Sequence, residues 1–243
     1  MTFRCENGAG RRAMNLGNRD VHVWHWSSEP PPARLAVLER WLSPEESERA
    51  ARFRFERHRA AFLAARGTLR ELLGEYAGCA PAEVAFAYNS YGKPSLAAPA
   101  CALRFNLSHS GGIAAAAFTA GCEVGIDVER ADRRVDLKVA DAHFSPYEIE
   151  RLYRLPEDER PAAFFRIWTR KEAFVKAQGK GLSLPLAGFD VTVDPGDPPA
   201  ILRCAWDESA PARWMLVDLT VELGCPAALA VADPTCAVRV FSR

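Results

Sequence analysis

A segment of this chain occurs twice, 102 residues apart, and this repeat limits the folds that the chain can adopt. Residues 43–62 and 145–164 share nine identities in twenty positions without a gap. The identities are Ser43/Ser145, Pro44/Pro146, Glu46/Glu148, Glu48/Glu150, Arg49/Arg151, Arg52/Arg154, Ala60/Ala162, Ala61/Ala163 and Phe62/Phe164. Two copies of a common helix start would leave a similar trace, and so would duplication of one ancestral unit. Under duplication we expect two similar halves related by a pseudo-two-fold axis, with a ligand site between them.

Each copy begins with the same helix-start signal. Ser43 and Ser145 fit the N-cap position, a proline follows at the first helical position, and Glu46 or Glu148 stands three residues after the cap. Helical periodicity then reaches about Tyr76 in the first copy and Gln178 in the second. The strand-like segments are Val21–Trp26, Val84–Tyr88, Leu103–Leu107, Ile113–Thr119, Val124–Val128, Phe189–Val193, Ile201–Trp206, Trp214–Val221, Ala227–Val231 and Val238–Phe241. Long helices combined with many adjacent strands predict an α+β fold.

The repeat and the strand pattern suggest domain boundaries. We divide the chain into a disordered leader at residues 1–18, an N-terminal α+β half at 19–122 and a C-terminal α+β half at 123–243.

Composition and charge narrow the class of protein. Lysine plus arginine and aspartate plus glutamate each number 31, so net charge favours neither nucleic acid nor a membrane as partner. Apolar runs are shorter than the ~20 residues of a membrane span. The seven cysteines form no Cys-x-x-Cys pair. We therefore expect a cytoplasmic protein with reduced thiols.

Carboxylates at strand and helix spacing suggest a metal site. Asp127 and Glu129 alternate along the predicted strand, so both side chains point to one face. Like charges this close repel each other, and a divalent cation such as Mg²⁺, which prefers oxygen ligands, removes the repulsion. A solvated acidic strand end is the alternative. Glu172 and Lys176 lie four residues apart on the predicted helix and hence on one face; the alternative there is an ordinary surface ion pair.

Other segments carry groups that bind phosphate. Ser108 and His109 lie where a strand passes into a turn at Gly111–Gly112, and hydroxyls, backbone N–H groups and an imidazole in such a turn can hold a phosphate. A solvated or capping histidine is the alternative. Guanidinium groups bind phosphate in a bidentate way, although most arginines of such a run cover a solvated helix face. The arginines of the first helical region are Arg49, Arg52, Arg54, Arg57, Arg59, Arg66 and Arg70. Together these groups indicate metal-assisted transfer at a phosphate or pyrophosphate.

Several motifs resemble those of one family. FNLSHS at Phe105–Ser110, GIDVE at Gly125–Glu129, WTRKEAFVK at Trp168–Lys176 and YGKP at Tyr91–Pro94 resemble the 4′-phosphopantetheinyl transferases of the larger Sfp type. The resemblance implies a monomeric, single-chain pseudo-dimer that depends on Mg²⁺. Such an enzyme would transfer the 4′-phosphopantetheine arm of coenzyme A to a serine of an acyl or peptidyl carrier protein and release adenosine 3′,5′-bisphosphate. The motifs do not distinguish fatty acid, polyketide, non-ribosomal peptide and siderophore carriers.

The resemblance also implies roles for individual residues. By motif position, Asp127, Glu129 and Glu172 would hold Mg²⁺, and Glu172 would be the candidate general base. The other implied contacts are Arg49 and Arg59 at the 3′-phosphate, Lys93 and Pro94 near the adenine, Ser108 near the nucleotide, His109 at a phosphate of coenzyme A, and Lys176 at the pyrophosphate, where it would stabilise developing charge. One position departs from the family pattern: Glu46 stands where family members can carry a basic residue. We therefore expect the 3′-phosphate contacts to be weaker or built differently.

Other activities fit parts of the same pattern. A Mg²⁺-dependent hydrolase of a nucleotide pyrophosphate would use similar side chains. A module that binds coenzyme A or carrier proteins without catalysis would tolerate the loss of an acidic ligand, whereas this chain retains Asp127, Glu129 and Glu172. Nucleic-acid binding is disfavoured by the zero net charge.

Overall fold

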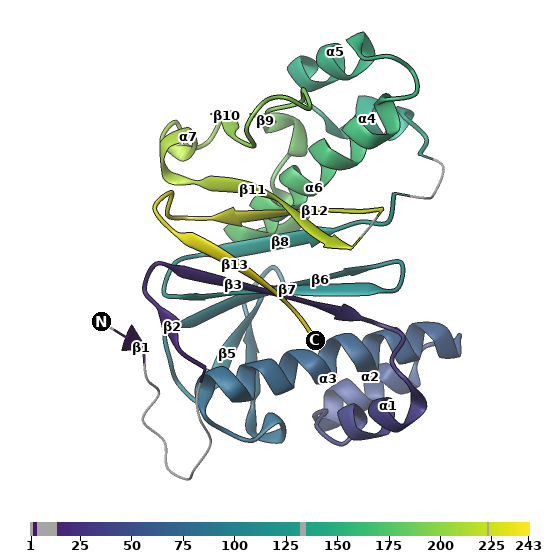
Figure 1. The fold of residues 1–243 in the computed structure, drawn as a ribbon, viewed down its shortest axis with the longest axis vertical. Helices are drawn as coiled ribbons and strands as arrows, with labels where there is room; N and C mark the ends of the chain where they lie inside the picture. Colours follow the sequence, from purple (N-terminus) through teal and green to yellow (C-terminus); the bar gives the residue numbers. More distant parts are fainter. Residues whose placement is uncertain (1, 4–13, 132–134, 223) are drawn as a thin grey trace.

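Two β-sheets pack face to face, and helices cover the outer face of each sheet (Figure 1). The computed structural model describes residues 2–3, 14–131, 135–222 and 224–243. The first sheet has the strand order β13-β3-β7-β6 and the second β11-β12-β8. These strands are β3 (Asp20–Ser27), β6 (Leu103–Ser110), β7 (Ile113–Ala120), β8 (Val124–Val128), β11 (Met215–Glu222), β12 (Cys225–Val231) and β13 (Ala237–Ser242).

A long helix packs on each sheet: α3 (Glu56–Ala77) on the first and α6 (Arg160–Gln178) on the second. The other helices are α1 (Pro32–Glu39), α2 (Pro44–Ala51), α4 (Lys138–His143), α5 (Pro146–Arg154) and α7 (Ala210–Arg213), with short 3-10 helices at Pro81–Glu83, Gly181–Ser183 and Leu186–Gly188. Small two-stranded ribbons are formed by β1 (Thr2–Phe3) with β2 (Leu16–Gly17), β4 (Ala85–Tyr88) with β5 (Pro94–Ala98), and β9 (Phe189–Val191) with β10 (Ile201–Cys204).

The order of elements is the same in both halves, which confirms the predicted α+β fold of two similar units. A strand (β3 or β8) is followed by short helices, a long helix, a two-stranded ribbon and a hairpin whose second strand pairs with the first strand. Both predicted capping boxes form, with Ser43 accepting from the Glu46 N–H and Ser145 from the Glu148 N–H. Both long helices end at a left-handed glycine.

Three apolar layers stabilise this arrangement. One lies between α3 and the first sheet, and one between α6 and the second sheet. The third lies between the sheets, where Val21 and Val23 of β3 share a cluster with Ile126 of β8. Since side chains alternate along a strand, the residues of β8 on either side of Ile126 face α6 instead.

Side chains from β6 join the two halves along the open edge of β8. The N–H of Ile126 donates to Asn106 Oδ1 at 2.9 Å, and the N–H of Val128 donates to Ser108 Oγ at 3.3 Å. These side chains satisfy N–H groups that would otherwise form an unpaired sheet edge. Asn106 and Ser108 thereby fix β8 in register against β6, and we call this junction the β6–β8 seam.

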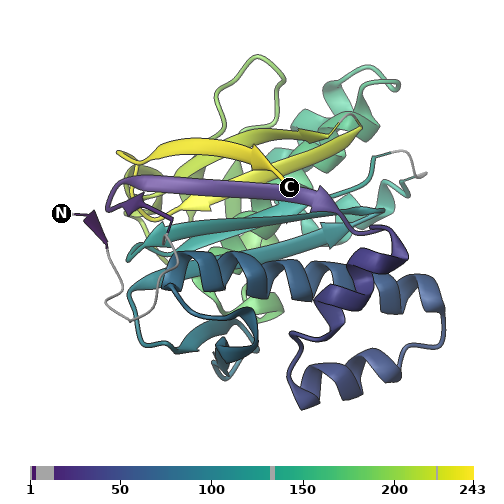
Figure 2. The same cartoon turned by 60° about the horizontal axis from the view of Figure 1, so that its bottom comes forward.

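The last strand breaks the symmetry of the two halves. β13 follows the C-terminal half in the chain, yet it pairs in parallel with β3 of the first sheet (Figures 1 and 2). The register places Ala237 opposite Asp20 and Ser242 opposite His25. The strand at 238–241 was expected from the sequence, but its partner was not.

The structure differs from the sequence predictions within the predicted leader at residues 1–18 and in elements that were not predicted. Within 1–18, residues 1 and 4–13 lie outside the described residues, while Leu16 is buried in the core on α3. Helices α1 and α4 and strand β5 were not predicted. No helix in the described segments combines the length and apolar character that a membrane crossing requires.

Candidate active site at the seam

The carboxylate of Asp127 lies at the β6–β8 seam, beside the last turn of α6. Asp127 is 3% exposed. Its Oδ1 accepts hydrogen bonds from Lys176 Nζ at 2.6 Å and from Ser108 Oγ at 3.0 Å. Lys176 Nζ also donates to Ser108 Oγ at 2.9 Å. Asp127 Oδ2 is buried and has no hydrogen-bond partner among the described residues, so this oxygen can serve a cation.

Glu172 and Glu129 add two further carboxylates to this cluster. Burial raises the pKa of Glu172, and the negative charges of Asp127 and Glu129 raise it further, whereas Lys176 lowers it. Burial likewise raises the pKa of Asp127 against the opposing effect of Lys176. Ser110 Oγ donates to Glu129 Oε2 at 2.9 Å. The structure thus brings together the three carboxylates and the lysine that the sequence singled out.

Close packing of α6 on β8 makes this cluster possible. A Cβ at Gly125 would lie 2.1 Å from the Ala173 carbonyl oxygen and 2.4 Å from the Ala177 nitrogen, so no other residue fits there without moving the helix. Gly125 is two residues before Asp127 and shares its face of β8. The glycine of GIDVE therefore sets the short distance between the strand carboxylate and the helix side chains.

Ser108 and His109 lie on β6 and not in the turn that was expected to hold them. The strand continues to Ser110, and the turn is at Gly111 and Gly112, both with positive φ. Ser108 is buried at the seam, and His109 projects from the opposite face of the strand. The His109 side chain reaches solvent, yet the surrounding protein and the charges of Lys176 and Arg49 lower its pKa. Its imidazole is thus electrostatically coupled to both cations.

Arg49 lines a cavity of about 690 Å³ between α2, α3 and β4, whereas Arg59 does not. The Arg49 guanidinium carbon lies 5.2 Å from the centre of the Phe62 ring. Arg59 instead pairs with Glu39 and with Glu56 on the outside of α3. The cavity, which we call the α2–α3 cavity, is lined by Leu42, Ser43, Pro44, Glu45, Glu46, Arg49, Phe62, Arg66, Arg70, Ala82, Glu83, Val84, Ala85, Phe86 and Tyr88.

Lys93 and Pro94 line a separate cavity of about 260 Å³ at the boundary of the halves. Lys93 Nζ donates to the Ala177 carbonyl at 2.8 Å and to Glu123 Oε2 at 2.7 Å. Asn89 Nδ2 donates to the Gly179 carbonyl at 2.7 Å. The turn that contains Lys93 is therefore fixed to the end of α6. Its contact at Ala177 is one residue beyond Lys176, which contacts Asp127.

Comparisons with known proteins cover both halves of the chain. Residues 123–232 match the 4′-phosphopantetheinyl transferase superfamily, and residues 25–120 match the 4′-phosphopantetheinyl transferase, N-terminal, family. The chain is 39% identical over 222 residues to the 4′-phosphopantetheinyl transferase HetI of Nostoc sp. (strain PCC 7120), which spans 90% of each protein. This chain belongs to the 4′-phosphopantetheinyl transferase superfamily. The transferase is also 33% identical over 151 residues to Sfp of Bacillus subtilis (strain 168), covering 62% of this chain and 66% of Sfp.

The family assignment confirms the enzyme class and reaction that the motifs predicted. The protein is a phosphopantetheinyl transferase, an enzyme that uses coenzyme A as substrate and acts on carrier protein domains. Among solved structures, the Thermotoga maritima holo-acyl-carrier-protein synthase matches 46% of this chain and 62% of that chain, with 20% identity and a TM-score of 0.36.

Sequence reasoning missed the partners of the two capping glutamates in the transferase. Glu148 accepts from Lys171 Nζ at 2.6 Å, and both side chains are fully buried. Glu46 accepts from Arg70 Nε at 2.6 Å and also from Arg66. The repeat could have revealed the Glu46–Arg70 and Glu148–Lys171 contacts. Arg70 and Lys171 both stand eight residues before the glycine that ends their helix, so they occupy equivalent positions.

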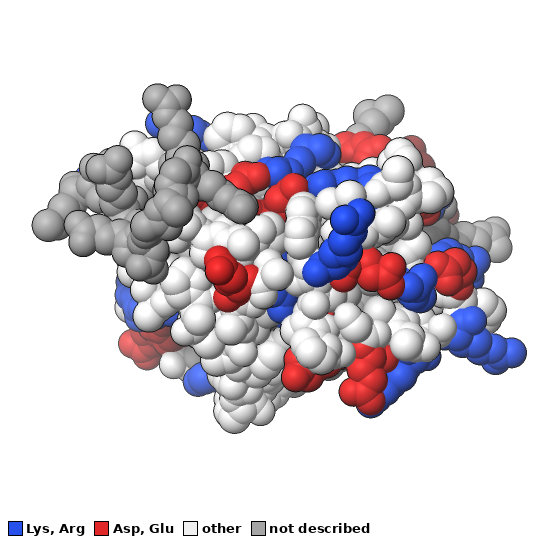
Figure 3. Space-filling view, turned by 90° about the horizontal axis from the view of Figure 1, so that it is seen from below, with Lys and Arg blue, Asp and Glu red and all other residues white. Residues whose placement is uncertain are grey.

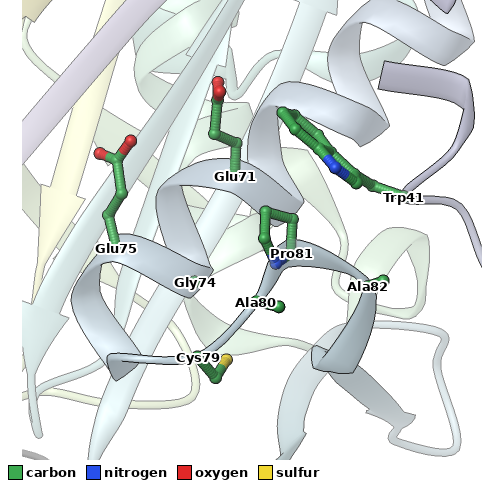
Figure 4. Close-up of a pocket in the computed structure, with 8 residues that line it drawn as sticks. All are labelled: Trp41, Glu71, Gly74, Glu75, Cys79, Ala80, Pro81 and Ala82. Atoms are coloured by element: carbon green, nitrogen blue, oxygen red, sulfur yellow. The ribbon is translucent and has the colours of Figure 1, made fainter. Parts of the chain in front are cut away.

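The same alignment locates the N-terminal counterpart of the seam cluster, which carries different side chains. Glu71 and Glu75 of α3 correspond to Glu172 and Lys176, and they rise from successive turns of the helix (Figure 4). Both bind Arg243, which follows β13. Trp24 of β3 pairs with Ala116 of β7, and Asp127 of β8 pairs with Ala228 of β12. Trp24 therefore corresponds to Asp127. This counterpart thus has an arginine and a tryptophan where the seam has a lysine and an aspartate, and its Glu71 and Glu75 also line a pocket of about 400 Å³.

Proposed function

We propose that the transferase moves the 4′-phosphopantetheine arm of coenzyme A to a serine of an acyl or peptidyl carrier protein at the seam cluster of Asp127, Glu129, Glu172 and Lys176. The observation that carries this proposal is the buried Asp127 carboxylate. One of its oxygens is held by Lys176 and Ser108, and the other is without a hydrogen-bond partner in the described part of the chain. Such an oxygen suits a metal ion.

The residues at the seam fit Mg²⁺. No group of three or more His, Cys, Asp or Glu side chains in the described segments is arranged to enclose a metal by itself. Mg²⁺ is ordinarily bound by one or two carboxylates together with substrate phosphates and water, so a complete protein cage is not required. The free Oδ2 of Asp127 would be its ligand, with Glu129 and Glu172 nearby. Bound there, the ion would polarise the pyrophosphate oxygens of coenzyme A.

The side chains of the cluster supply the proton transfer and the charge stabilisation. The serine oxygen of the carrier attacks the phosphorus that bears the pantetheine arm, and the bond from that phosphorus to adenosine 3′,5′-bisphosphate breaks. Glu172 accepts the serine proton, a role that suits a carboxylate whose pKa is raised by burial. Lys176 stabilises negative charge on the phosphate oxygens. His109 and Ser108 lie on opposite faces of β6, where His109 would contact a phosphate and Ser108 would orient Asp127 and Lys176.

The remaining candidate residues belong to the nucleotide end of coenzyme A. Arg49 would contact a phosphate from the α2–α3 cavity, and Lys93 and Pro94 would adjoin the adenine. Arg59 keeps its expected role at the 3′-phosphate as a hypothesis that its ion pairs do not favour. We also propose a monomer, since one chain contributes both sides of the seam.

Intact-protein mass spectrometry of an apo carrier protein tests this function. The carrier is incubated with the transferase, coenzyme A and Mg²⁺, and in parallel with EDTA. A mass gain of one phosphopantetheine arm that disappears with EDTA is the expected result. Consumption of coenzyme A without a mass gain on several carriers would instead identify a hydrolase. Mass gain that is unaffected by EDTA would contradict the proposed role of Mg²⁺.

A further inference from the structure

Two cysteines contact each other at the place where the two halves of the chain meet. Cys122 lies in the turn between β7 and β8, and Cys236 lies in the turn between β12 and β13. Both are free thiols, and their side chains share a hydrogen bond. Both are partly buried and pack against the apolar layer between the sheets. Two sulfur atoms that are far apart in the chain thus face each other in the fold.

Backbone hydrogen bonds hold the two turns side by side. The N–H of Ala232 donates at 3.0 Å to the carbonyl of Glu123, which follows Cys122 in the chain. The N–H of Cys236 donates to the Asp233 carbonyl at 3.4 Å and closes the second turn. The contact between the sulfur atoms therefore follows from the packing of the two turns against each other.

The surroundings of Cys236 decide which thiol reacts first. Its thiol also shares a hydrogen bond with the Asp233 carboxylate, which accepts from the N–H and the hydroxyl of Thr235 at 2.8 and 2.7 Å. Burial raises the pKa of Cys236, and the neighbouring Cys122 and Asp233 raise it further. Because the thiolate is the nucleophile in thiol–disulfide exchange, Cys236 is a poor attacking group and exchange begins at Cys122.

The turn that contains Cys236 can adjust to a covalent bond. An S–S bond is about 2.05 Å long, so the two sulfur atoms must move closer than in a hydrogen bond. Pro234 and Thr235, directly before Cys236, are exposed and form the tip of the turn. Gly121, directly before Cys122, has a positive φ and open space around its Cα. Neither turn is enclosed by the core on its outer side, so a local shift is sufficient.

Strand β13 is the element that such a bond would hold. It follows the C-terminal half in the chain but completes the sheet of the N-terminal half. Its far end is held by the ion pairs of Arg243 with Glu71 and Glu75. The surface formed by α1–α3 has basic and acidic side chains interspersed (Figure 3). Ion pairs on such a surface contribute little stability and weaken with salt, so a covalent bond at the start of β13 would supply what they do not.

We propose that Cys122 and Cys236 are a redox-active pair, and that their oxidation to a disulfide fastens the start of β13 to the junction of the two halves. The bond would enclose residues 122–236, which include the whole second sheet and α6. A cross-link that closes so long a loop restricts the unfolded chain and thereby stabilises the folded one. This inference is independent of the proposed function, because it involves neither the seam cluster nor coenzyme A.

A low-molecular-weight disulfide such as oxidised glutathione supplies the oxidant. The sulfur of Cys122 loses its proton and attacks one sulfur of the small disulfide, whose other half leaves as a thiol that carries this proton. The sulfur of Cys236 then displaces the second half from Cys122, and the departing thiol takes the proton of Cys236. Two protein thiols are thereby oxidised to one disulfide, and the small disulfide is reduced to two thiols.

Peptide mapping of the wild-type chain tests the pairing. The protein is equilibrated with oxidised and reduced glutathione at several ratios, free thiols are blocked with N-ethylmaleimide, and the digest is analysed without reduction. We expect a cross-linked peptide that joins Cys122 to Cys236, and an intact protein that carries two fewer maleimide groups than the reduced sample. Glutathione adducts alone, cross-links between other cysteines, or complete blocking at every ratio would overturn the proposal.

Thermal unfolding measures the effect of the bond on the fold. Oxidation should raise the Tm of wild type by about 5 °C or more, as expected for a disulfide in a protein of this size. It should not change the Tm of Cys122→Ser or Cys236→Ser. Cys101→Ser is the matched control, because Cys101 is also a partly buried free thiol but packs in the layer on α3, and this variant should respond like wild type.

The comparison does not depend on how well each variant folds. Each variant is measured before and after oxidation, so a loss of stability from the substitution itself cancels, and the mapping requires only wild type. A cross-link between Cys122 and Cys236 that leaves the Tm of wild type unchanged would contradict the role assigned to the bond at β13. An equal rise in Tm in Cys122→Ser and in wild type would assign the effect to other cysteines and overturn the proposal.

Discussion

At the scale of single residues, Lys176 pairs with the buried Asp127 carboxylate and, in the proposed reaction, stabilises negative charge on the phosphate oxygens. In the structure it holds Asp127 Oδ1 and Ser108 Oγ, so it compensates the buried carboxylate when no other cation is present. Its neighbour one helical turn earlier, Glu172, has a raised pKa because it is buried beside the other carboxylates. The raised pKa means that the ionised Glu172 carboxylate binds the proton it accepts more strongly than an exposed glutamate would.

We predict that Glu172→Gln lowers the rate of carrier modification by about 100-fold or more, because the variant cannot accept the serine proton. The matched control is Glu71→Gln, since Glu71 occupies the corresponding position in α3 and lies in the counterpart that Arg243 fills. The control should retain transfer within about twofold. Initial rates from intact-carrier mass spectrometry measure both variants, and comparable rates for the two would refute the assignment of Glu172.

We predict that His22 makes the transferase less stable as the pH falls. Burial lowers the pKa of His22. The charge of Asp20 raises this pKa by a smaller amount, and the charge of Arg239 lowers it further. Below about pH 6.5 the unfolded chain therefore takes up a proton that the folded chain refuses, and stability falls by at most about 1.4 kcal/mol per pH unit for this group. Urea unfolding of wild type and His22→Gln between pH 7.5 and about pH 5.5 should give a flatter profile for the variant. Parallel profiles would contradict this, and His58→Gln, at an exposed site, is the control.

Sequence alone identified the residues of the seam but not their partners. Asp127, Glu129, Glu172 and Lys176 were recognisable because strand and helix periodicity put each pair on one face. The contact between the two pairs was not readable, since it depends on how closely α6 approaches β8. Glu46 looked like a departure from the family pattern, and its ion pairs with Arg66 and Arg70 became visible only once α2 and α3 were packed together.

At the scale of elements, the two long helices differ in how closely they approach their sheets. Gly125 lets α6 lie directly on β8, with Ala177 above it. The corresponding residues of the N-terminal half are His22 and Tyr76, whose Nδ1 and hydroxyl are 2.8 Å apart. Two rings therefore stand where the C-terminal half has a glycine and an alanine. At this point α3 cannot approach β3 as closely as α6 approaches β8.

We predict that Gly125→Ala destabilises the fold by about 3 kcal/mol and reduces transfer more than its stability loss explains. The added methyl group would overlap the α6 backbone, so the helix must shift, as in other overpacked cores. Gly196→Ala is the control, because a Cβ there meets no described atom within 4 Å. Urea denaturation measures stability, and the transfer rate is compared well below the unfolding transition. A folded Gly125→Ala variant with wild-type rate would show that the helix spacing does not matter.

The elements that were predicted are those with a strong apolar pattern or with a proline or glycine at a boundary. The segment 124–128 was placed correctly because it is a continuous apolar run except for Asp127, and α6 ends at Gly179 as expected. Helix α1 was missed because Pro30–Pro32 look like a break, although Pro32 in fact starts the helix. His109 was assigned to a turn because glycines follow it, whereas β6 continues past it under the pairing imposed by β7.

At the scale of the whole molecule, β13 makes the two halves of the chain different. It lies along the edge of β3, where the second half-site would otherwise open, and Arg243 beyond it engages Glu71 and Glu75. The Arg243 guanidinium carbon also lies 5.9 Å from the Trp24 ring centre. The counterpart is therefore closed by a strand and a cation, while the seam at Asp127 remains accessible through Lys176, which is 28% exposed.

We predict that Arg239→Pro destabilises the protein by about 2 kcal/mol, whereas Val240→Pro costs less than half as much. The N–H groups of Ala237 and Arg243 donate to Arg19 and His25 of the neighbouring segment, so alternate amides of β13, including that of residue 239, face β3. Proline removes such a bond at 239 but not at 240. Hydrogen exchange of the β3 amides together with urea unfolding measures the difference. Equal effects at the two positions would mean that the ladder to β3 contributes little.

The pairing of β3 with β13 has a consequence for the order in which the protein matures on the ribosome. β3 is synthesised early, but its parallel partner emerges only after the entire C-terminal half. Until then, a nascent N-terminal half presents an unpaired, largely apolar strand edge, the kind of surface that recruits other chains. Such long-range pairing also slows folding. The transferase should therefore depend on chaperones during synthesis, and fragments cut between the halves should aggregate even though each contains a helix and a sheet of its own.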